Sequence, residues 1–433
     1  MASKGKAHGI PGTALALALL AAGCGLATAS TDATATSIPA GIAAASAPGA
    51  AAGSWTPQWA KDAVFYQIFP ERFRNGDPSN DPPGTLPWGG QPQNFSFFGG
   101  DLAGVLQKLD YLQDLGVTAI YFNPIFTSPS NHKYDTVDYL QIDPHFGDLS
   151  TFQSLLQAAH ARGMHVILDG VFNHTSNQNP KFIDASTNGP SSPYWSWYNI
   201  YGLPVVTTPT PNYDAWWGFA TLPKLMVEKT PAVADYLINQ VVDFWDKQGI
   251  DGWRLDVPNE VGTDFWDRFR QKVKGDNPNA YIVGEIWTDA TAWVQGDKFD
   301  SVMNYMWRGN MLQFFAQESM NVDTFDANQA ALRSNYPLPA TQVMFNLLGS
   351  HDTERFLYLA GGDVWKLKAA AFYQMTYPGT PVIYYGDEIG MTGGKDPDDR
   401  RCFPWDQSVW NADLRQHYHT LIRLREAHSA LRT

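Results

Sequence analysis

The chain has 433 residues, of which 44% are hydrophobic and 17% charged, so it is long enough for one large globular domain or a few ordinary ones and is not disordered throughout. Its 30 Lys and Arg against 43 Asp and Glu give a formal net charge of −13. Because a duplex-binding protein needs a basic face, we expect no nucleic-acid partner. Two cysteines exclude a disulfide scaffold and a cysteine-based zinc site.

The first 30 residues have the pattern of a secretory signal peptide. Lys4 and Lys6 precede a short apolar run at 13–22, and small residues follow. The residues that end at Cys24 also resemble a bacterial lipoprotein box, in which this cysteine becomes the acylated N-terminus. We therefore expect an exported protein, either attached to a membrane through acylated Cys24 or freely secreted. Residues 25–53 carry almost no large side chains and are expected to form a flexible tether.

From position 54 onward, short apolar runs alternate with amphipathic stretches at helical spacing. The expected strands are 63–69, 117–122, 164–168, 252–257, 281–286, 301–305, 343–348 and 381–385. Eight strand–helix units favour an α/β fold of the (β/α)8, or TIM, barrel type over 54–433. The alternative is an open, doubly wound sheet, but the turn at 67–72 lacks the glycines of a phosphate-binding loop.

Capping residues mark the boundaries of the expected helices. One helix is expected to be capped by Ser150 or Thr151, and another to start at Thr230–Pro231 and end before Gly249. A stretch at about 173–229 is rich in Pro, Asn, Tyr and Trp and shows no clear period. Since it is too long for an ordinary loop, we expect an inserted subdomain after the third strand.

Charged residues follow the ends of several expected strands, where a (β/α)8 barrel places its active site. Three acids come from three different strands and are expected to converge on one mouth: Asp256, Glu285 and Asp352. Four further polar residues follow strand ends nearby: Asp169, His174, Arg254 and His351. A single acid at a strand end is readily explained by a structural ion pair, but this combination argues against a purely structural role.

Two carboxylates that flank a scissile bond are what hydrolysis of a glycosidic bond requires. One attacks or stabilises the sugar, and the other must carry a proton for the leaving group. Arg254 lies two residues before Asp256, on the same face of the strand, and is expected to keep Asp256 ionised and nucleophilic. Trp287 beside Glu285 is expected to supply the apolar surroundings that a general acid needs.

Four segments resemble, in order and on the expected strands, the signature regions of the α-amylase family, glycoside hydrolase family 13. They are 169–174, 252–256, 284–287 and 348–352. The resemblance extends over about 59–431 and implies a retaining mechanism. In it, Asp256 would be the nucleophile, Glu285 the general acid/base and Asp352 the transition-state stabiliser.

The resemblance also implies contacts with the substrate. Four residues would bind the sugar in the cleaved subsite: Asp169, His174, Arg254 and His351. Tyr134 matches the family's sugar-stacking tyrosine, and Asp396 and Arg400 match a neighbouring sugar-binding pair.

Within the family, several segments resemble the group of neopullulanases, cyclomaltodextrinases and maltogenic amylases. They are 130–136, 216–219, 222–225 and the pair Asn259–Glu260, which would face the acceptor side. That group usually has an N-terminal β-domain that builds its dimer, and the family usually has a C-terminal β-sandwich. We expect neither within this chain, and the oligomeric state is left open.

A turn after the first strand concentrates the hard oxygen ligands that suit Ca²⁺. The candidate ligands are Asn75, Asp77, Asn80, Asp81, Asp101 and the carbonyl of Gly99. The alternative is a polar turn that caps itself. Because the stretch resembles the calcium loop of the neopullulanase group, we expect a structural Ca²⁺ that takes no part in the chemistry.

These observations predict an exported glycoside hydrolase that cleaves α-1,4 bonds in starch, maltodextrins or cyclodextrins. A second possibility is a transglycosylase of the same family, with the balance set by water access beside Asn259 and Glu260. A third is a non-catalytic surface protein that holds glucan. The presence of all three acids argues against the third.

Overall fold

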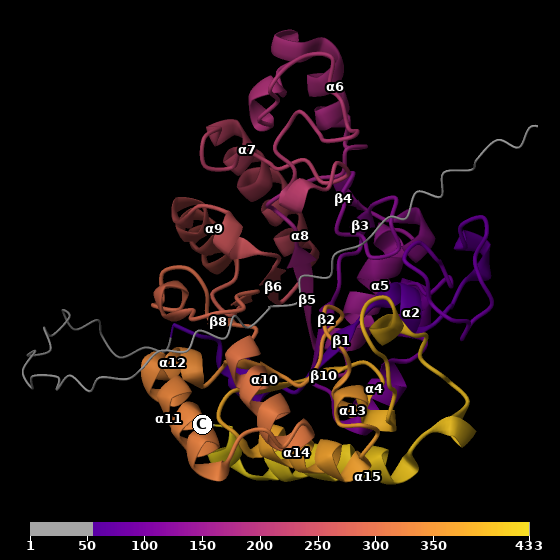
Figure 1. Cartoon of the computed structure of the whole chain (residues 1–433), viewed down its shortest axis with the longest axis vertical. Coiled ribbons are helices and arrows are strands. Elements are labelled where there is room, and N and C mark those ends of the chain that lie inside the picture. The colour runs from indigo at the N-terminus through magenta and orange to yellow at the C-terminus, as the bar shows by residue number, and fades with distance from the viewer. Residues whose placement is uncertain (1–54, 433) are drawn as a thin grey trace, which may run out of the picture. The chain divides into compact units, whose positions relative to one another are not determined.

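The computed structural model describes residues 55–432 (Figure 1). The expected signal peptide and tether, with Cys24, lie outside the described residues. Within 55–432, no helix is both long enough and apolar enough to cross a membrane.

Eight parallel strands form one sheet in the order β8-β7-β6-β5-β2-β1-β10-β9. Their bounds are β1 (Phe65–Ile68), β2 (Ala119–Phe122), β5 (His165–Gly170), β6 (Gly252–Leu255), β7 (Tyr281–Gly284), β8 (Ser301–Val302), β9 (Phe345–Leu347) and β10 (Thr380–Tyr384). A parallel bridge between Met303 and Phe345 joins the two outermost strands, and Asn304 N donates to Phe345 O at 2.9 Å. The sheet therefore closes, and the expected (β/α)8 barrel is confirmed.

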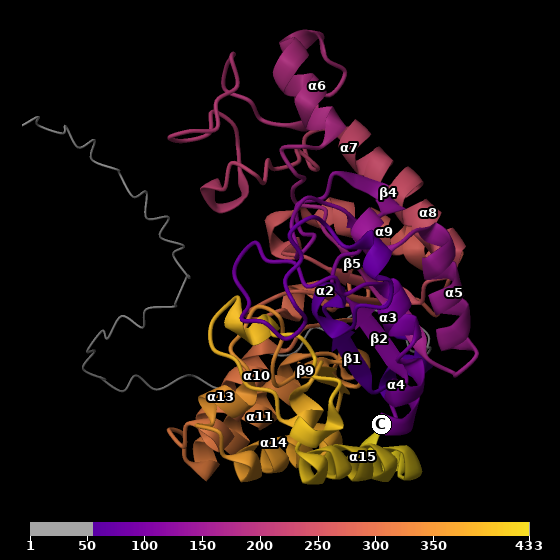
Figure 2. The same ribbon diagram turned by 90° about the vertical axis from the view of Figure 1, so that its right-hand side faces the viewer.

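Helices surround this barrel, and α14 and α15 pack against each other at its side (Figure 2). The helices are α1 (Gln58–Asp62), α2 (Pro70–Phe73), α3 (Leu102–Leu106), α4 (Leu109–Leu115), α5 (Leu149–His160), α6 (Pro180–Asn188), α7 (Pro231–Tyr236), α8 (Asp243–Gln248), α9 (Thr263–Asp276), α10 (Tyr305–Met311), α11 (Val322–Asn335), α12 (Leu338–Thr341), α13 (Phe356–Leu359), α14 (Val364–Thr376) and α15 (Ala412–Ala427).

Two capping predictions need correction. Helix α5 is capped by Asp148, whose carboxylate accepts from Thr151 N, and not by Ser150 or Thr151. Thr230 precedes α7 as expected, but its hydroxyl donates to Ser196 O, so it makes no side-chain cap. In both cases the sequence marks the helix start to within two residues, because several polar residues compete for the capping position.

Six of the eight barrel strands are shorter than expected, whereas β5 is one residue longer and β10 has the expected length. In the shortened strands the backbone turns away soon after the buried run. After β6, Val257 adopts a left-handed conformation with φ 35°, and after β8 Asn304 caps α10 through its side chain. The structure also contains a small antiparallel hairpin, β3 (Phe126–Thr127) and β4 (Asp138–Ile142), which the sequence pattern did not indicate.

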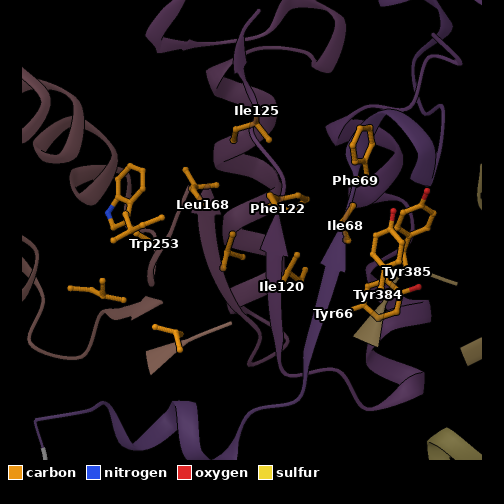
Figure 3. Close-up of a cluster of buried hydrophobic side chains, with 14 of the residues drawn as sticks. Tyr66, Ile68, Phe69, Ile120, Phe122, Ile125, Leu168, Trp253, Tyr384 and Tyr385 are labelled. Atoms are coloured by element: carbon orange, nitrogen blue, oxygen red, sulfur yellow. The ribbon is translucent and has the colours of Figure 1, made fainter. Parts of the chain in front are cut away.

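Side chains alternate between two hydrophobic cores along each strand. Ala119 and Tyr121 of β2 belong to the cluster inside the barrel, whereas Ile120 and Phe122 belong to the larger cluster beneath the helices (Figure 3). This period of two is the ordinary consequence of the strand pleat. It means that inward positions at the strand ends face the mouth of the barrel.

Residues 171–230, which include the expected inserted subdomain, connect β5 to α7 and contribute no strand to the barrel sheet. They contain α6, several 3₁₀ turns and short bridges such as His174–Lys224 and Tyr198–Leu225. Figure 1 shows α6 beyond the end of the barrel toward which β5 points.

Candidate active site

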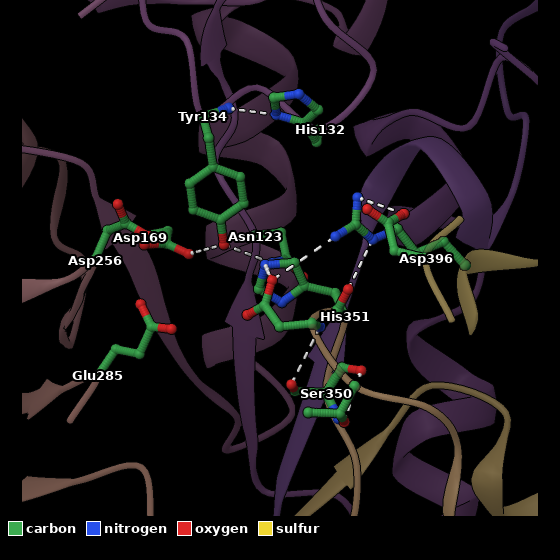
Figure 4. Close-up of polar contacts among 12 residues, drawn as sticks. Asn123, His132, Tyr134, Asp169, Asp256, Glu285, Ser350, His351 and Asp396 are labelled. Atoms are coloured by element: carbon green, nitrogen blue, oxygen red, sulfur yellow. Dashed lines mark hydrogen bonds and ion pairs between the residues drawn. The ribbon is translucent and has the colours of Figure 1, made fainter. Parts of the chain in front are cut away.

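The C-terminal ends of the barrel strands carry the charged residues that the sequence singled out. Asp169 is the second-to-last residue of β5, and Asp256 and Glu285 directly follow β6 and β7. Asp352 follows β9 after a short loop. Since β5, β6 and β7 are neighbours in the sheet, their acids face the same space at the mouth (Figure 4).

Arg254 of β6 is fully buried and joins three of these acids. Its Nη1 lies 2.8 Å from Asp169 Oδ1 and 3.1 Å from Asp256 Oδ1. Its Nη2 lies 2.7 Å from Glu285 Oε2. One planar guanidinium therefore holds Asp256 and Glu285 together, on strands whose axes are about 4.8 Å apart.

Two further donors surround the carboxylate of Glu285. Val257 N donates to Oε2 at 3.1 Å, and Trp287 Nε1 donates to Oε1 at 2.9 Å. Contrary to the expectation of an apolar neighbour, Trp287 thus contacts the carboxylate through its polar edge. Its ring stacks on Tyr305 with centroids 3.6 Å apart and stays 46% exposed.

The electrostatic balance at the mouth differs from the expectation. Burial raises the pKa of Asp256 well above its usual range, and the guanidinium of Arg254 only opposes this effect. Removal from water also raises the pKa of Asp352 to about 7, and the carboxylate of Glu285 adds to this, although the side chain of Asp352 keeps 29% exposure. Because several acids share few cations, their full ionisation at the mouth is unfavourable.

A set of hydrogen bonds fixes the predicted sugar-stacking ring. Tyr134 donates to Asp169 Oδ2 at 2.7 Å, Tyr121 donates to the same oxygen at 2.6 Å, and Asn123 donates to the Tyr134 hydroxyl at 3.0 Å. The ring of Tyr134 lies parallel to that of His351, with centroids 5.2 Å apart. The ring is therefore held in place before any sugar binds.

His351 joins this group to a second arginine. Gln67 Nε2 donates to His351 Nδ1 at 2.9 Å, so the ring proton is assigned to Nε2, which lies 3.2 Å from Asp352 Oδ1. Burial lowers the pKa of His351 well below its usual range, so the ring is neutral. Arg400 Nε donates to His351 O at 2.7 Å, and its Nη1 lies 3.1 Å from Asp396 Oδ1.

His174 begins a stack of aromatic rings at the edge of the mouth. It is buried, its Nε2 has no hydrogen-bond partner among residues 55–432, and burial lowers its pKa to about 3. Its ring stacks on Trp216 at 5.1 Å, and Trp216 stacks on Trp217 at 4.8 Å. Trp217 is 65% exposed. Sequence reasoning did not assign these tryptophans to the site, although their adjacency within 216–219 was a visible signal.

The pair expected on the acceptor side occupies the 3₁₀ turn Pro258–Glu260, which follows β6. Asn259 is exposed. Glu260 accepts from Trp216 Nε1 at 3.1 Å and from Lys224 Nζ at 3.0 Å. Glu260 therefore connects the barrel to the segment after β5 and holds Trp216, the middle ring of the aromatic stack.

The residues predicted to bind calcium form a compact turn, and some of their polar groups already make hydrogen bonds within it. Asp101 caps α3 and also accepts from Gly76 N at 3.1 Å and Asp77 N at 2.8 Å. Asp77 accepts from Ser79 N at 3.0 Å, as a self-capped turn requires. Within the described part of the chain, no group of three or more His, Cys, Asp or Glu side chains has the arrangement of a metal site.

Other oxygens of the same turn are free. The side-chain oxygens of Asn75 and Asn80 are buried without a hydrogen-bond partner. Asp81 accepts from Asn75 Nδ2 at 2.9 Å, and its carboxylate approaches Gly99, whose φ of 80° and missing Cβ allow this contact. Unpaired amide oxygens beside a carboxylate fit the oxygen-rich surroundings that Ca²⁺ prefers.

Comparisons with known proteins agree with this geometry. The family profile described as alpha amylase, catalytic domain, matches residues 67–432. Neopullulanase 2 of Thermoactinomyces vulgaris is 54% identical over 382 residues, which cover 87% of this chain and 64% of that protein. A cyclomaltodextrinase of Bacillus sp is 50% identical over 380 residues, which cover 87% of this chain and 68% of that protein. The chain thus spans about two thirds of the length of these curated relatives.

Among solved structures, a cyclic alpha-maltosyl-(1→6)-maltose hydrolase from Arthrobacter globiformis, in complex with cyclic alpha-maltosyl-(1→6)-maltose, is similar over the whole barrel. Its TM-score is 0.86 at 42% identity, covering 87% of this chain and 85% of that one. The profile match extends over far more than half of the sequence, and its range contains every acid at the mouth. The chain therefore belongs to the α-amylase family.

Proposed function

We propose that this protein is a retaining glycoside hydrolase that cleaves α-1,4-glucosidic bonds in starch, maltodextrins or cyclodextrins. The contact of one guanidinium, that of Arg254, with both Asp256 and Glu285 carries the proposal, because it sets two carboxylates side by side on adjacent strands. Retaining glycosidases need such closely spaced carboxyl groups, about 5–5.5 Å apart. The names of the similar proteins support the same substrate class.

In the proposed reaction, Glu285 gives its proton to the glycosidic oxygen while an Asp256 oxygen attacks the anomeric carbon. The leaving sugar departs with that proton, and a covalent glycosyl–Asp256 intermediate forms. Glu285 then takes a proton from water, which attacks the same carbon and regenerates the Asp256 carboxylate. Trp287 and Val257 hold the carboxyl group of Glu285 in position for both steps.

The charge distribution at the mouth favours the transition state. The sugar becomes oxocarbenium-like and gains positive charge as the bond breaks. Burial and mutual repulsion raise the pKa of Asp256 and of Asp352, so their ionised forms are disfavoured in the free enzyme. A positive charge that develops on the sugar stabilises the ionised acids, and preorganised groups of this kind supply much of the rate enhancement of enzymes.

Transfer to a sugar acceptor is the second candidate activity. The exposed ring of Trp217 lies at the end of the stack that starts at His174, and Glu260 fixes the middle ring. An acceptor sugar resting on this platform would compete with water for the covalent intermediate. The third possibility, a protein that holds glucan without cleaving it, requires that the acids be inactive.

Product analysis separates these three functions. Purified protein is incubated with soluble starch, pullulan and β-cyclodextrin, each with and without added glucose, and Glu285→Gln serves as the control. Shorter sugars from at least one substrate support hydrolysis, and products that contain the added glucose indicate transfer. Tight binding of starch without any turnover would contradict the enzymatic proposal.

We further propose that the turn near β1 binds a structural Ca²⁺. The candidate ligands are Asn75, Asp77, Asn80, Asp81, Asp101 and the Gly99 carbonyl, and the unpaired amide oxygens of Asn75 and Asn80 support the proposal. A cation that binds only the folded state stabilises it by mass action. Chelation is therefore expected to lower the melting temperature of the wild type but not that of Asp77→Ala. Identical melting curves with and without chelator would favour the self-capped turn.

We also propose that the protein is exported and attached to a membrane through acylated Cys24. The support is the order of charged, apolar and small residues in the first 30 positions. The wild type is expected to sediment with membranes and Cys24→Ala to be released. A soluble wild type whose N-terminus lies after Cys24 would favour plain secretion.

A further inference from the structure

A pocket of about 610 Å³ lies between the loop before α3 and the segment that follows Asp396. It is lined by Gly84, Leu86, Pro92, Gln93, Asn94, Phe95, Ser96 and Pro397. Its volume is in the range of ordinary small-molecule sites, about 300–1,000 Å³. None of these residues takes part in the chemistry proposed above.

The pocket lies beside a pair of residues at the mouth of the barrel. Pro397 directly follows Asp396, which pairs with Arg400, and Arg400 Nη2 lies 3.7 Å from Asp352 Oδ1. Figure 4 shows Asp396 on the far side of His351 from Asp256 and Glu285. Pro397 therefore places the pocket next to the Asp396–Arg400 pair, whereas the Trp217 stack is held by Glu260, in the turn after β6.

The lining combines one bare aromatic ring with free amides. Phe95 is 77% exposed, and its ring contacts no other aromatic ring or cation among residues 55–432. The side-chain amides of Gln93 and Asn94 are exposed and make no hydrogen bond to the described part of the chain. A glucose unit offers an apolar C–H face to such a ring and hydroxyl groups to such amides, so the lining fits a sugar better than a purely apolar ligand.

The backbone that presents Phe95 is anchored on both sides. Asn131 Nδ2 donates to Asn94 O at 3.1 Å and to Ser96 O at 2.8 Å, and Arg72 Nη2 donates to Ser96 O at 2.9 Å. Asn131 belongs to the segment that also carries Tyr134. The ring is thus fixed relative to the cleaved subsite, which lowers the entropic cost of binding a sugar there.

We propose that this pocket is a distal sugar subsite, with Phe95 as its stacking platform. It takes α-glucan units that extend beyond the unit held by Asp396 and Arg400, on the side away from the leaving group. The proposal rests on the proposed function and adds to it a preference for longer linear chains. A second copy of this chain covering Phe95 is the competing explanation for the exposed ring.

The first experiment compares Phe95→Ala with Trp365→Ala, which removes an equally exposed ring (76%) from α14, one that packs against Lys368. We measure kcat/KM for maltotriose and for maltohexaose. Phe95→Ala is expected to lower the value for maltohexaose roughly five- to tenfold, the effect of losing one stacked ring, and to change that for maltotriose by less than about twofold. Trp365→Ala is expected to change neither. An unaltered ratio between the two substrates in Phe95→Ala would overturn the subsite.

The second experiment measures binding without turnover, so that it separates the subsite from the proposed activity. Maltohexaose is titrated into Glu285→Gln and into the double variant Glu285→Gln/Phe95→Ala. If the subsite exists, the double variant binds maltohexaose roughly five- to tenfold more weakly than Glu285→Gln does. This result is expected even if the wild type proves inactive on every glucan. Equal affinities, or a change of sedimentation coefficient in Phe95→Ala without a change in affinity, would assign Phe95 to an interface between copies instead.

Discussion

The two ends of the barrel differ in how many positively charged or hydrogen-bonding partners each acid has. We call the end where the strands begin the closed end; there, Asp300 and Asp251 each have their own partners. Asp300, ahead of β8, contacts Arg270 at 2.9 Å and Lys274 at 2.7 Å. It also accepts a hydrogen bond from Ile282 N at 2.9 Å. Asp251, ahead of β6, lies 2.8 Å from both His160 Nε2 and His165 Nδ1. At the mouth, by contrast, three acids share the single guanidinium of Arg254.

The pKa values record this difference. At the closed end, hydrogen bonds from two histidines lower the pKa of Asp251 to about 2, despite the opposing effect of burial. At the mouth, burial and neighbouring acids raise the pKa of Asp256 and bring that of Asp352 to about 7. The acids at the closed end therefore stabilise the fold. The acids at the mouth repel one another, a cost to stability that a role in function explains.

The largest effect that separates the two ends is on turnover. Glu285→Gln and Asp256→Asn are each expected to lower kcat by about 10⁴-fold or more, because each removes a group that acts on the breaking bond. Circular dichroism is expected to show an intact fold in both variants. Near-normal kcat in either variant would mean that the replaced acid takes no part in the reaction, and the mouth would then not differ from the closed end in function.

The same comparison predicts opposite changes in stability. Asp300→Asn leaves Arg270 and Lys274 without their buried counter-charge, so we expect it to lower the free energy of unfolding by about 3 kcal/mol. Its kcat is expected to stay close to that of the wild type. Asp256→Asn, which removes a repelled acid, is expected to raise the free energy of unfolding by about 1 kcal/mol. Chemical denaturation measures both free energies of unfolding. A lower free energy of unfolding for Asp256→Asn would contradict the repulsion among the acids at the mouth.

A smaller effect concerns the pH dependence of stability. Because the pKa of Asp352 is higher in the folded than in the unfolded protein, the folded state binds the proton more tightly, and stability falls as pH rises from about 4 to 7. The variant Asp352→Asn has no carboxyl group at this position, so it does not lose stability in this way as the pH rises. Its melting temperature is expected to exceed that of the wild type by an amount that grows from pH 5 to pH 8 and reaches roughly 1–3 °C, a small value because the side chain is partly exposed. A constant difference across this range would contradict the raised pKa.

The sequence predicts the barrel and the gathering of charged residues at its mouth well, because both follow from local patterns. The alternation of apolar residues places Trp253 and Leu255 outside and leaves Arg254 and Asp256 to face inward. Strand ends of a parallel barrel meet at one face, so acids from distant positions converge without any knowledge of the loops. The charged residues of the mouth were therefore accessible from the sequence.

The features that sequence reasoning missed depend on contacts between distant segments. The indole of Trp287 turns its N–H toward Glu285, a choice of orientation that the order of residues does not reveal. Glu260 reaches Lys224 and Trp216 across the segment after β5, and this contact forms only in the folded chain. The pKa of Asp256 likewise reflects the sum of burial and several charges, whereas the sequence showed only the nearest cation, Arg254.

The stereochemistry of the first product tests the central claim most directly. If the mouth brings Asp256 and Glu285 together as a nucleophile and an acid/base, the reaction passes through a covalent intermediate and retains the anomeric configuration. Proton NMR of the new reducing end, recorded in the first minutes on maltohexaose before mutarotation, is expected to show the α-anomer. An initial β-anomer would mean that water attacks the sugar directly, and it would contradict the close pairing of these two carboxylates.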